Sequence, residues 1–237
     1  MNNDGCCCYR HGVPCCFEQL YGNQVITDDN FYYSDYPNLF RQYQIDSYLR
    51  HGKPMKNITF INLNNEFRRL WEEHIVWTKL TIMALASNAP DTALVTNRLL
   101  RNADDFGNLF AHFYDQSVAK QFANLMRDHL TIAADLVVAA KKGDNNAVKM
   151  IDDKWHRNAD DIARFMSSIN PYFNETEIRN MFYNHLALTK DEAVAILTNK
   201  YEEAIRLFDK IEAQALMMSD MFLDGLARQF PNKIIRW

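Results

Sequence analysis

Histidine and carboxylate side chains recur at a regular spacing through the chain, in a combination that could bind a transition metal. Imidazole and carboxylate groups are the usual protein ligands of Zn, Fe and Mn, and helical bundles often carry such sites in their cores. The three histidines are separated by 55 and then 56 residues. The candidate ligands are His74, His129, His185, Asp105, Asp161 and Glu212.

The spacing belongs to an internal repeat. The pentapeptide RNADD at residues 101–105 recurs at 157–161, 56 residues later. The same offset relates His129 to His185, and a fainter copy begins near His74. Self-similarity at a fixed period indicates a repeated structural unit. The chain is therefore expected to contain three copies of one unit.

Each unit is expected to be a helical hairpin. From about residue 65 apolar residues recur at i, i+3 and i+4, which is the pattern of an amphipathic helix. Pro90, Gly143 and Pro171 interrupt that pattern, because proline and glycine end helices. We therefore predict an all-α fold, a six-helix bundle of three hairpins, with helices at 66–87, 91–113, 117–141, 145–168, 174–198 and 200–230.

A hairpin brings residues equidistant from its turn to one level. On this basis His74 faces Asp105 about the turn at residues 89–90. The second and third hairpins pair His129 with Asp161 and His185 with Glu212. Asn102, Asn158 and Asp209 lie one turn from the acids, on the same helix faces. Three hairpins packed side by side would carry one polar layer across the bundle.

Two interpretations of this layer stay open. In the first, histidines and acids bind a metal, or the acids fix the histidine tautomers from a second layer. In the second, separate His–acid pairs satisfy buried polar groups and set the helix register. The ferritin-like di-metal pattern is excluded, because no Glu-x-x-His occurs in the chain.

All five cysteines lie in the first sixteen residues, at a distance from the repeats. An odd, clustered set cannot pair fully within one chain, and adjacent cysteines form strained disulfides. The alternatives are cross-links between chains, thiolate binding of a soft metal, lipid attachment, and a reduced tail without a role. The candidate cross-linking residues are Cys6, Cys7, Cys8, Cys15 and Cys16.

The rest of the chain divides by composition. We predict a Cys-rich segment at 1–16, an aromatic arm at 17–64, the helical bundle at 65–230 and a short tail at 231–237. The arm has too many aromatic residues for a disordered linker, so it should pack on its own body or on a neighbouring subunit. The tail is apolar and basic, and could pack on its own bundle or on a neighbour.

Composition excludes several classes of protein. The 237 residues are 48% hydrophobic and 24% charged, with a net charge of −4. A protein that mainly coats nucleic acid would carry a basic excess. No apolar run reaches the ~20 residues of a membrane span, and the first residues lack the pattern of a secretory signal. Glycine-rich phosphate loops, G-x-S-x-G and H-E-x-x-H are missing, so we expect no enzyme of those classes.

Residues 70–230 resemble an uncharacterised family of helical proteins from spore-forming bacteria. The resemblance is carried by residues 73–78 (EHIVWT), 97–102 (NRLLRN), 128–133 (DHLTIA) and 214–218 (QALMM). Some members have been labelled acetylglutamate kinase, but this chain lacks the glycine-rich nucleotide-binding pattern such an enzyme needs. The resemblance implies a helical fold and leaves the function open.

Two functions follow as expectations. The first is a structural, self-assembling protein, a filament or spore surface layer subunit whose arm binds the next copy and whose cysteines cross-link the contact. Similarity in composition to cysteine-clustered proteins of spore outer layers favours it. Such a protein would be made in the cytoplasm and deposited on a spore or cell surface. The alternative is a metal-binding, redox-active bundle that uses the histidine and carboxylate layer with Zn, Fe or Mn.

Overall fold

The computed structural model describes residues 9–10, 13–14 and 58–235. The chain forms two units, Met1–Arg41 and Gln42–Trp237. In the first unit, β1 (Tyr9–Arg10) pairs antiparallel with β2 (Val13–Pro14). The five cysteines and the aromatic residues 17–57 lie outside the described residues. The predicted cross-linking segment and most of the predicted arm therefore stay predictions.

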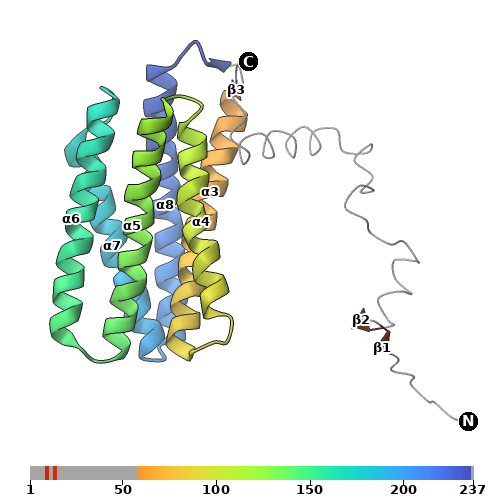
Figure 1. Ribbon diagram of the computed structural model, residues 1–237, viewed down its shortest axis with the longest axis vertical. Coiled ribbons are helices and arrows are strands. Elements are labelled where there is room, and N and C mark those ends of the chain that lie inside the picture. The colour runs from red at the N-terminus through yellow and green to blue at the C-terminus, as the bar shows by residue number, and fades with distance from the viewer. Residues whose placement is uncertain (1–8, 11–12, 15–57, 236–237) are drawn as a thin grey trace, which may run out of the picture. The chain divides into compact units, whose positions relative to one another are not determined.

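Six helices make up the described part of the second unit, as the periodicity predicts (Figure 1). The first helix begins at Phe60, six residues before its predicted start. Thr59 caps it, because its side chain accepts a hydrogen bond from the Asn62 N–H. The apolar periodicity did not predict this first turn, because Phe60 and Ile61 are exposed and do not continue the buried face of the helix. The helices are α3 (Phe60–Ser87), α4 (Thr92–Phe110), α5 (Gln116–Lys141), α6 (Asn145–Ile169), α7 (Glu175–Leu197) and α8 (Tyr201–Gln229).

Left-handed residues set the tight turns within the three helix pairs. Asn88 follows α3 with φ 55°, Gly143 follows α5 with φ 71°, and Asn199 follows α7 with φ 60°. Glycine and asparagine tolerate this conformation best, which is why they terminate helices. Each turn reverses the chain, so α4, α6 and α8 run back along α3, α5 and α7.

The six helices form two concentric sets. Helices α3, α5 and α7 all contact one another, so they enclose a central axis. Helices α4, α6 and α8 pack outside them, each in contact with two members of the inner set. The inner helices carry the histidines, and the outer helices carry the polar side chains opposite them. This arrangement decides which parts of the repeats meet.

The core is aromatic on one side of the histidines. The rings of Trp71, Phe106, Phe122 and Phe222 contact one another at centroid distances of 5.2–6.2 Å. Such pairs add to the free energy gained from burying their large apolar surfaces. This packing holds the inner helices in fixed positions around the axis.

The C-terminal tail packs on its own chain. β4 (Ile234–Ile235) pairs in parallel with β3 (Ile58–Thr59), directly before α3, and Ile234 is buried.

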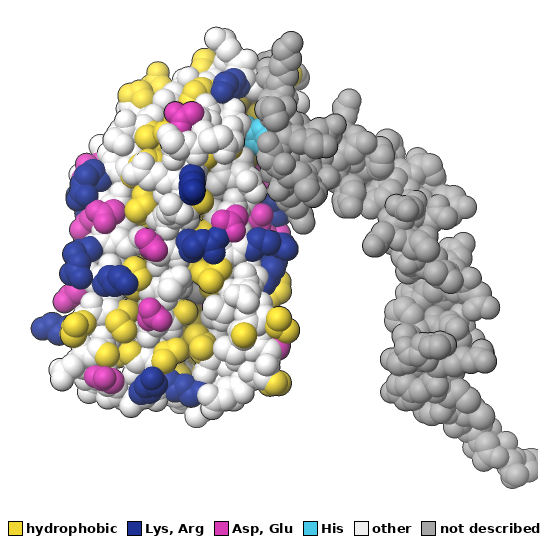
Figure 2. Space-filling model, viewed as in Figure 1, with side chains coloured by type: hydrophobic (Ala, Val, Ile, Leu, Met, Phe, Trp, Pro, Cys, Tyr) yellow, Lys and Arg dark blue, Asp and Glu magenta, His cyan; other side chains and the backbone are white. Residues whose placement is uncertain are grey.

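Basic and acidic side chains are interspersed over the bundle face seen in Figure 2. Among the described helices, none combines the length and apolarity that crossing a membrane requires.

Candidate metal centre

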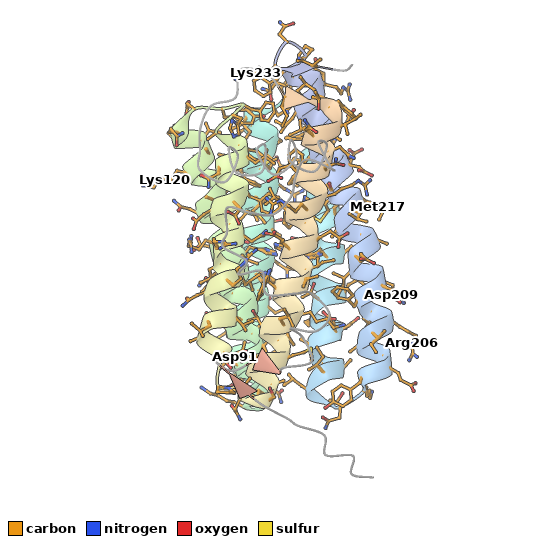
Figure 3. All side chains as sticks on the ribbon, turned by 90° about the vertical axis from the view of Figure 1, so that its right-hand side faces the viewer. Asp91, Lys120, Arg206, Asp209, Met217 and Lys233 are labelled. Carbon is orange, nitrogen blue, oxygen red and sulfur yellow. The ribbon has the colours of Figure 1, made fainter. Side chains whose placement is uncertain are left out.

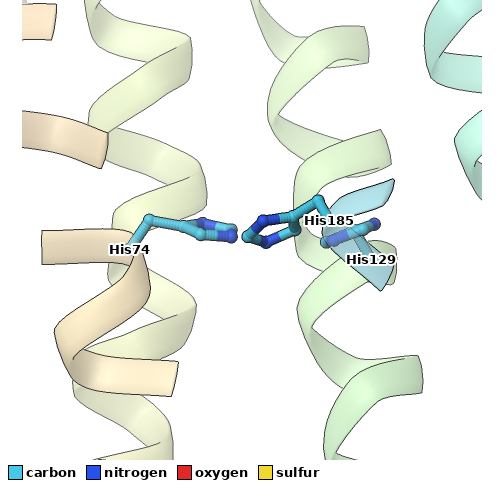
Figure 4. A group of neighbouring side chains, drawn as sticks. All are labelled: His74, His129 and His185. Carbon is cyan, nitrogen blue, oxygen red and sulfur yellow. The ribbon is translucent and has the colours of Figure 1, made fainter. Parts of the chain in front are cut away.

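Three histidine rings meet on the central axis of the bundle. His74 of α3, His129 of α5 and His185 of α7 each offer one nitrogen, and these three atoms lie within 4.8 Å of one another (Figure 4). Their ring centroids form a nearly equilateral triangle with sides of 5.6, 6.1 and 6.3 Å. At most 2% of each residue is exposed. The repeat thus places one imidazole from each inner helix at the same level.

The apolar face of each inner helix aims its histidine at the axis. Leu70, Trp71 and Thr78 flank His74 on the buried side of α3 at the three- and four-residue spacing of one helix face. On α5, Met126, Ile132 and Ala133 flank His129 in the same way, and α7 follows the same scheme. A histidine within such a face is directed inward because the remainder of the face must be buried.

A side-chain amide of the neighbouring outer helix holds each ring. The Nδ1 atoms of His74, His129 and His185 lie 3.1, 3.1 and 2.9 Å from the amide oxygens of Asn102, Asn158 and Gln214. Each amide also donates from its nitrogen to a backbone carbonyl of the helix that carries the histidine. These carbonyls belong to Leu70, Leu125 and Met181, four residues before each histidine, at 2.9–3.0 Å.

This double contact fixes the tautomer of all three rings. An amide whose nitrogen donates to a carbonyl must present its oxygen to the imidazole. An oxygen can only accept, so Nδ1 of each ring carries the proton and donates it. The lone pair is then on Nε2, the nitrogen available to a metal, and the hydrogen bond at Nδ1 orients the ring.

Burial keeps the three rings uncharged. Desolvation lowers the pKa of His129 to about 3 and that of His185 to about 4. It lowers the pKa of His74 well below its ordinary value, and repulsion from the other two rings lowers it further. A neutral imidazole is the form that ligates a metal. At neutral pH the site therefore presents three lone pairs without having to lose a proton.

Aromatic side chains surround the three rings. Trp71 lies 5.3 Å from the ring of His74, and Phe106 lies 6.4 Å from it. Trp155 and Phe182 lie 5.3 and 5.6 Å from the ring of His129. These contacts close the centre to bulk water and leave it with a low dielectric constant.

The three predicted carboxylates, all of them among the described residues, do not lie with the three histidines. Asp161 is exposed and accepts a hydrogen bond from Arg164 at 2.8 Å, and Asp105 faces Arg101 at 3.7 Å. Glu212 lies on the half-buried side of α8. The structure therefore brings together the three predicted histidines and separates them from the three predicted acids.

The error lies in the assumed centres of the turns. The midpoint of His74 and Asn102 is residue 88, where the left-handed Asn88 reverses the chain, whereas the sequence argument placed the centre at residues 89–90. The observed midpoints of the other two pairs fall at 143.5 and 199.5, at Gly143 and Asn199. A displacement of one or two residues brings an amide to the level where an acid was expected.

Two of the three amides were singled out in the sequence, and the third was missed. Asn102 and Asn158 were expected on the right face, but Asp209 was expected as the third member. Asp209 is exposed on α8, between Arg206 and Met217, which are exposed as well (Figure 3). The repeat offset held the correct signal, because 56 residues separate Asn102 from Asn158 and Asn158 from Gln214.

The geometry suits an ion with three nitrogen ligands and one free position. A tetrahedral ion with bonds of 2.0–2.1 Å spaces its nitrogens about 3.3 Å apart. The ring nitrogens, which lie within 4.8 Å of one another, would have to approach by up to about 1.5 Å to reach this spacing. Three protein ligands with an open fourth position are typical of catalytic zinc sites, whereas structural sites are closed by four.

Comparisons of the chain with protein-family models, curated proteins and solved structures give no match. The resemblance to the family from spore-forming bacteria therefore stays a prediction. The function has to be argued from the three histidines themselves.

Proposed function

We propose that this protein is a metal-binding helical bundle that holds one transition-metal ion at His74, His129 and His185. The observation that supports the proposal is the convergence of three buried, neutral imidazoles whose Nδ1 atoms are all fixed by amides. Buried polar groups are usually paired with one another. Here the amides of the outer helices take up Nδ1 of each ring, which leaves Nε2 of all three rings for a metal.

The ligand set narrows the choice of metal. Imidazole suits Zn, Cu, Fe and Ni, whereas Mn and Mg prefer carboxylate and other oxygen ligands. Without the predicted acids, Zn and Fe remain from the three metals expected, and Mn is disfavoured. The redox role belongs to the iron form of this proposal, since zinc has no redox chemistry.

Metal titration tests the proposal. Protein freed of metal by a chelator is titrated with Zn(II) and Co(II), and bound ions are counted by elemental analysis after dialysis. We expect one ion per chain. A His156→Gln variant should bind the same amount, because His156 lies on the outer helix α6 and its Nδ1 faces the carbonyl of Asp152. Less than a tenth of an ion per chain would overturn the proposal.

Self-assembly through the N-terminal cysteines is a second proposal, supported by the odd, clustered cysteine set in the sequence. If the cysteines cross-link chains, particles measured by light scattering and electron microscopy should shrink when reductant is added. Replacing all five cysteines with serine should have the same effect. Unchanged particle size in that variant would contradict cross-linking, and the metal site would be unaffected by the result.

A further inference from the structure

The three imidazoles offer an ion no negative charge. Burial lowers the pKa of all three rings, and the groups that raise it again are the amides of Asn102, Asn158 and Gln214, none of them a carboxylate. No carboxylate or thiolate of the described residues lies with the ring nitrogens. An ion bound by the rings alone therefore keeps its full charge.

The surroundings of the rings make that charge costly. The three histidines are at most 2% exposed, and their rings contact those of Trp71, Phe106, Trp155 and Phe182. The Born cost of moving an ion from water into such an interior grows with the square of its charge, so a divalent ion costs roughly four times as much as a monovalent ion of similar size. A divalent ion must bring an anion to lower this cost, whereas a monovalent ion needs none.

The donor set has three equivalent members among the described residues. His74, His129 and His185 each lie on an amide of an outer helix, and their ring centroids are 5.6–6.3 Å apart. Three nitrogens bound at about 2 Å to an ion in their own plane are spaced about 3.5 Å apart, against about 3.3 Å in a tetrahedral site. Because the nitrogens lie up to 4.8 Å apart, the planar arrangement needs the smaller approach. It is also complete with three ligands.

We propose that the centre takes copper as Cu(I), bound by the three Nε2 atoms in one plane without a fourth ligand. Imidazole suits copper, and copper has a monovalent state. The common alkali ions are monovalent as well, but they take oxygen ligands. The proposal rests on the proposed metal site and adds the charge and the coordination number of its ion. Zn(II) and Co(II) bind at the same place only together with hydroxide or another anion.

The first test compares Cu(I) with Zn(II) on the full chain in the absence of oxygen. All five cysteines are replaced by serine, because thiolates bind Cu(I) themselves. Competition with a chromophoric chelator for each ion gives the two dissociation constants. We expect one Cu(I) per chain, with an affinity at least about tenfold higher than that for Zn(II). X-ray absorption of the copper-loaded protein should show three nitrogen ligands and no fourth ligand.

Proton release provides a measurement that does not depend on affinity. The rings are neutral before the ion arrives, so Cu(I) should release no proton when it binds at pH 8 in chloride-free solution. Zn(II) should release about one proton per ion, because its bound water becomes hydroxide.

An Asn158→Asp variant tests the charge argument directly. The carboxylate keeps the shape of the side chain and an oxygen that accepts from Nδ1 of His129, and it adds one negative charge beside the ring. The ratio of the Cu(I) affinity to the Zn(II) affinity should then fall at least about tenfold. The matched control is Asn146→Asp, an exposed position on the same helix, which should leave the ratio unchanged. Far-UV circular dichroism checks that both variants stay helical.

The results distinguish the two proposals. If Zn(II) binds as tightly as Cu(I), or if copper carries a fourth ligand, the assignment to Cu(I) is wrong and the metal site stands. An unchanged affinity ratio in the Asn158→Asp variant would overturn it too, as would copper that stays bound after His129→Gln. If none of the three ions binds, the metal site falls, and the assignment of Cu(I) falls with it.

Discussion

The His129→Gln variant is expected to lose tight metal binding. The change removes one of three converging nitrogens and leaves a side chain of similar polarity in its place. Apparent free energies for zinc sites of four ligands are about 10–16 kcal/mol, or roughly 2.5–4 kcal/mol for each ligand. Removing one ligand should therefore weaken binding roughly a hundred- to a thousandfold. Competition with a chromophoric chelator at pH 7 measures the change.

The matched control is His156→Gln, the same substitution outside the centre. His156 contacts the ring of Tyr183 and lies away from the central axis, so its loss should leave the affinity as in wild type. Far-UV circular dichroism checks that both variants stay helical. Equal affinities of the wild type and the His129→Gln variant would show that the ion binds elsewhere, and the proposed centre would be wrong.

The metal-free protein is expected to lose much of its stability between pH 7 and pH 5. In the unfolded chain a histidine has a pKa near 6.5, whereas burial lowers the pKa to about 3 for His129 and about 4 for His185. The pKa of His74 is lowered as well. Between these values the unfolded state binds more protons, so the free energy of unfolding falls as the pH falls.

The expected loss in free energy of unfolding is large compared with the total stability of a single domain. At pH 5 the rings of His129 and His185 each contribute about 2 kcal/mol less than at pH 7, or roughly 4 kcal/mol together, and the lowered pKa of His74 adds to the loss. Domains of this size are typically stable by only about 5–15 kcal/mol. Asp105 and Glu192 oppose the trend, because burial raises the pKa of each carboxyl and the folded state then binds those protons more tightly.

Urea unfolding at pH 7, 6 and 5 in the presence of a chelator measures this dependence. Over the same range the His129→Gln variant should lose about 2 kcal/mol less stability than wild type, because one titrating ring is gone. Bound metal should raise the stability at pH 7 by mass action, since the unfolded chain lacks the assembled site. An equal free energy of unfolding at pH 5 and pH 7 would contradict the buried neutral state of the rings.

Local sequence patterns determined the helices and the level of the histidines. Apolar periodicity identified all six helices because each must bury one face, and the RNADD repeat showed that the units share one plan. The histidines were found because they occupy equivalent positions in that plan. These features depend on neighbours within a few turns of one helix, so a sequence displays them directly.

The partners of the histidines depended on finer geometry than the pattern carries. Asn88, Gly143 and Asn199 fixed the centre of each turn, and a displacement of one or two residues exchanged the expected acids for Asn102, Asn158 and Gln214. The sequence contained both possibilities. The position of the left-handed residue in each turn determined whether an acid or an amide lies opposite the histidine.

The convergence of the rings was a tertiary outcome. A repeat specifies one unit but not how its copies pack, so the sequence left both separate pairs and a common centre open. Packing the first helix of every unit inside, with the second helices around them, brought His74, His129 and His185 to one axis. Contacts between distant segments follow from how whole faces fit together, which no local pattern records.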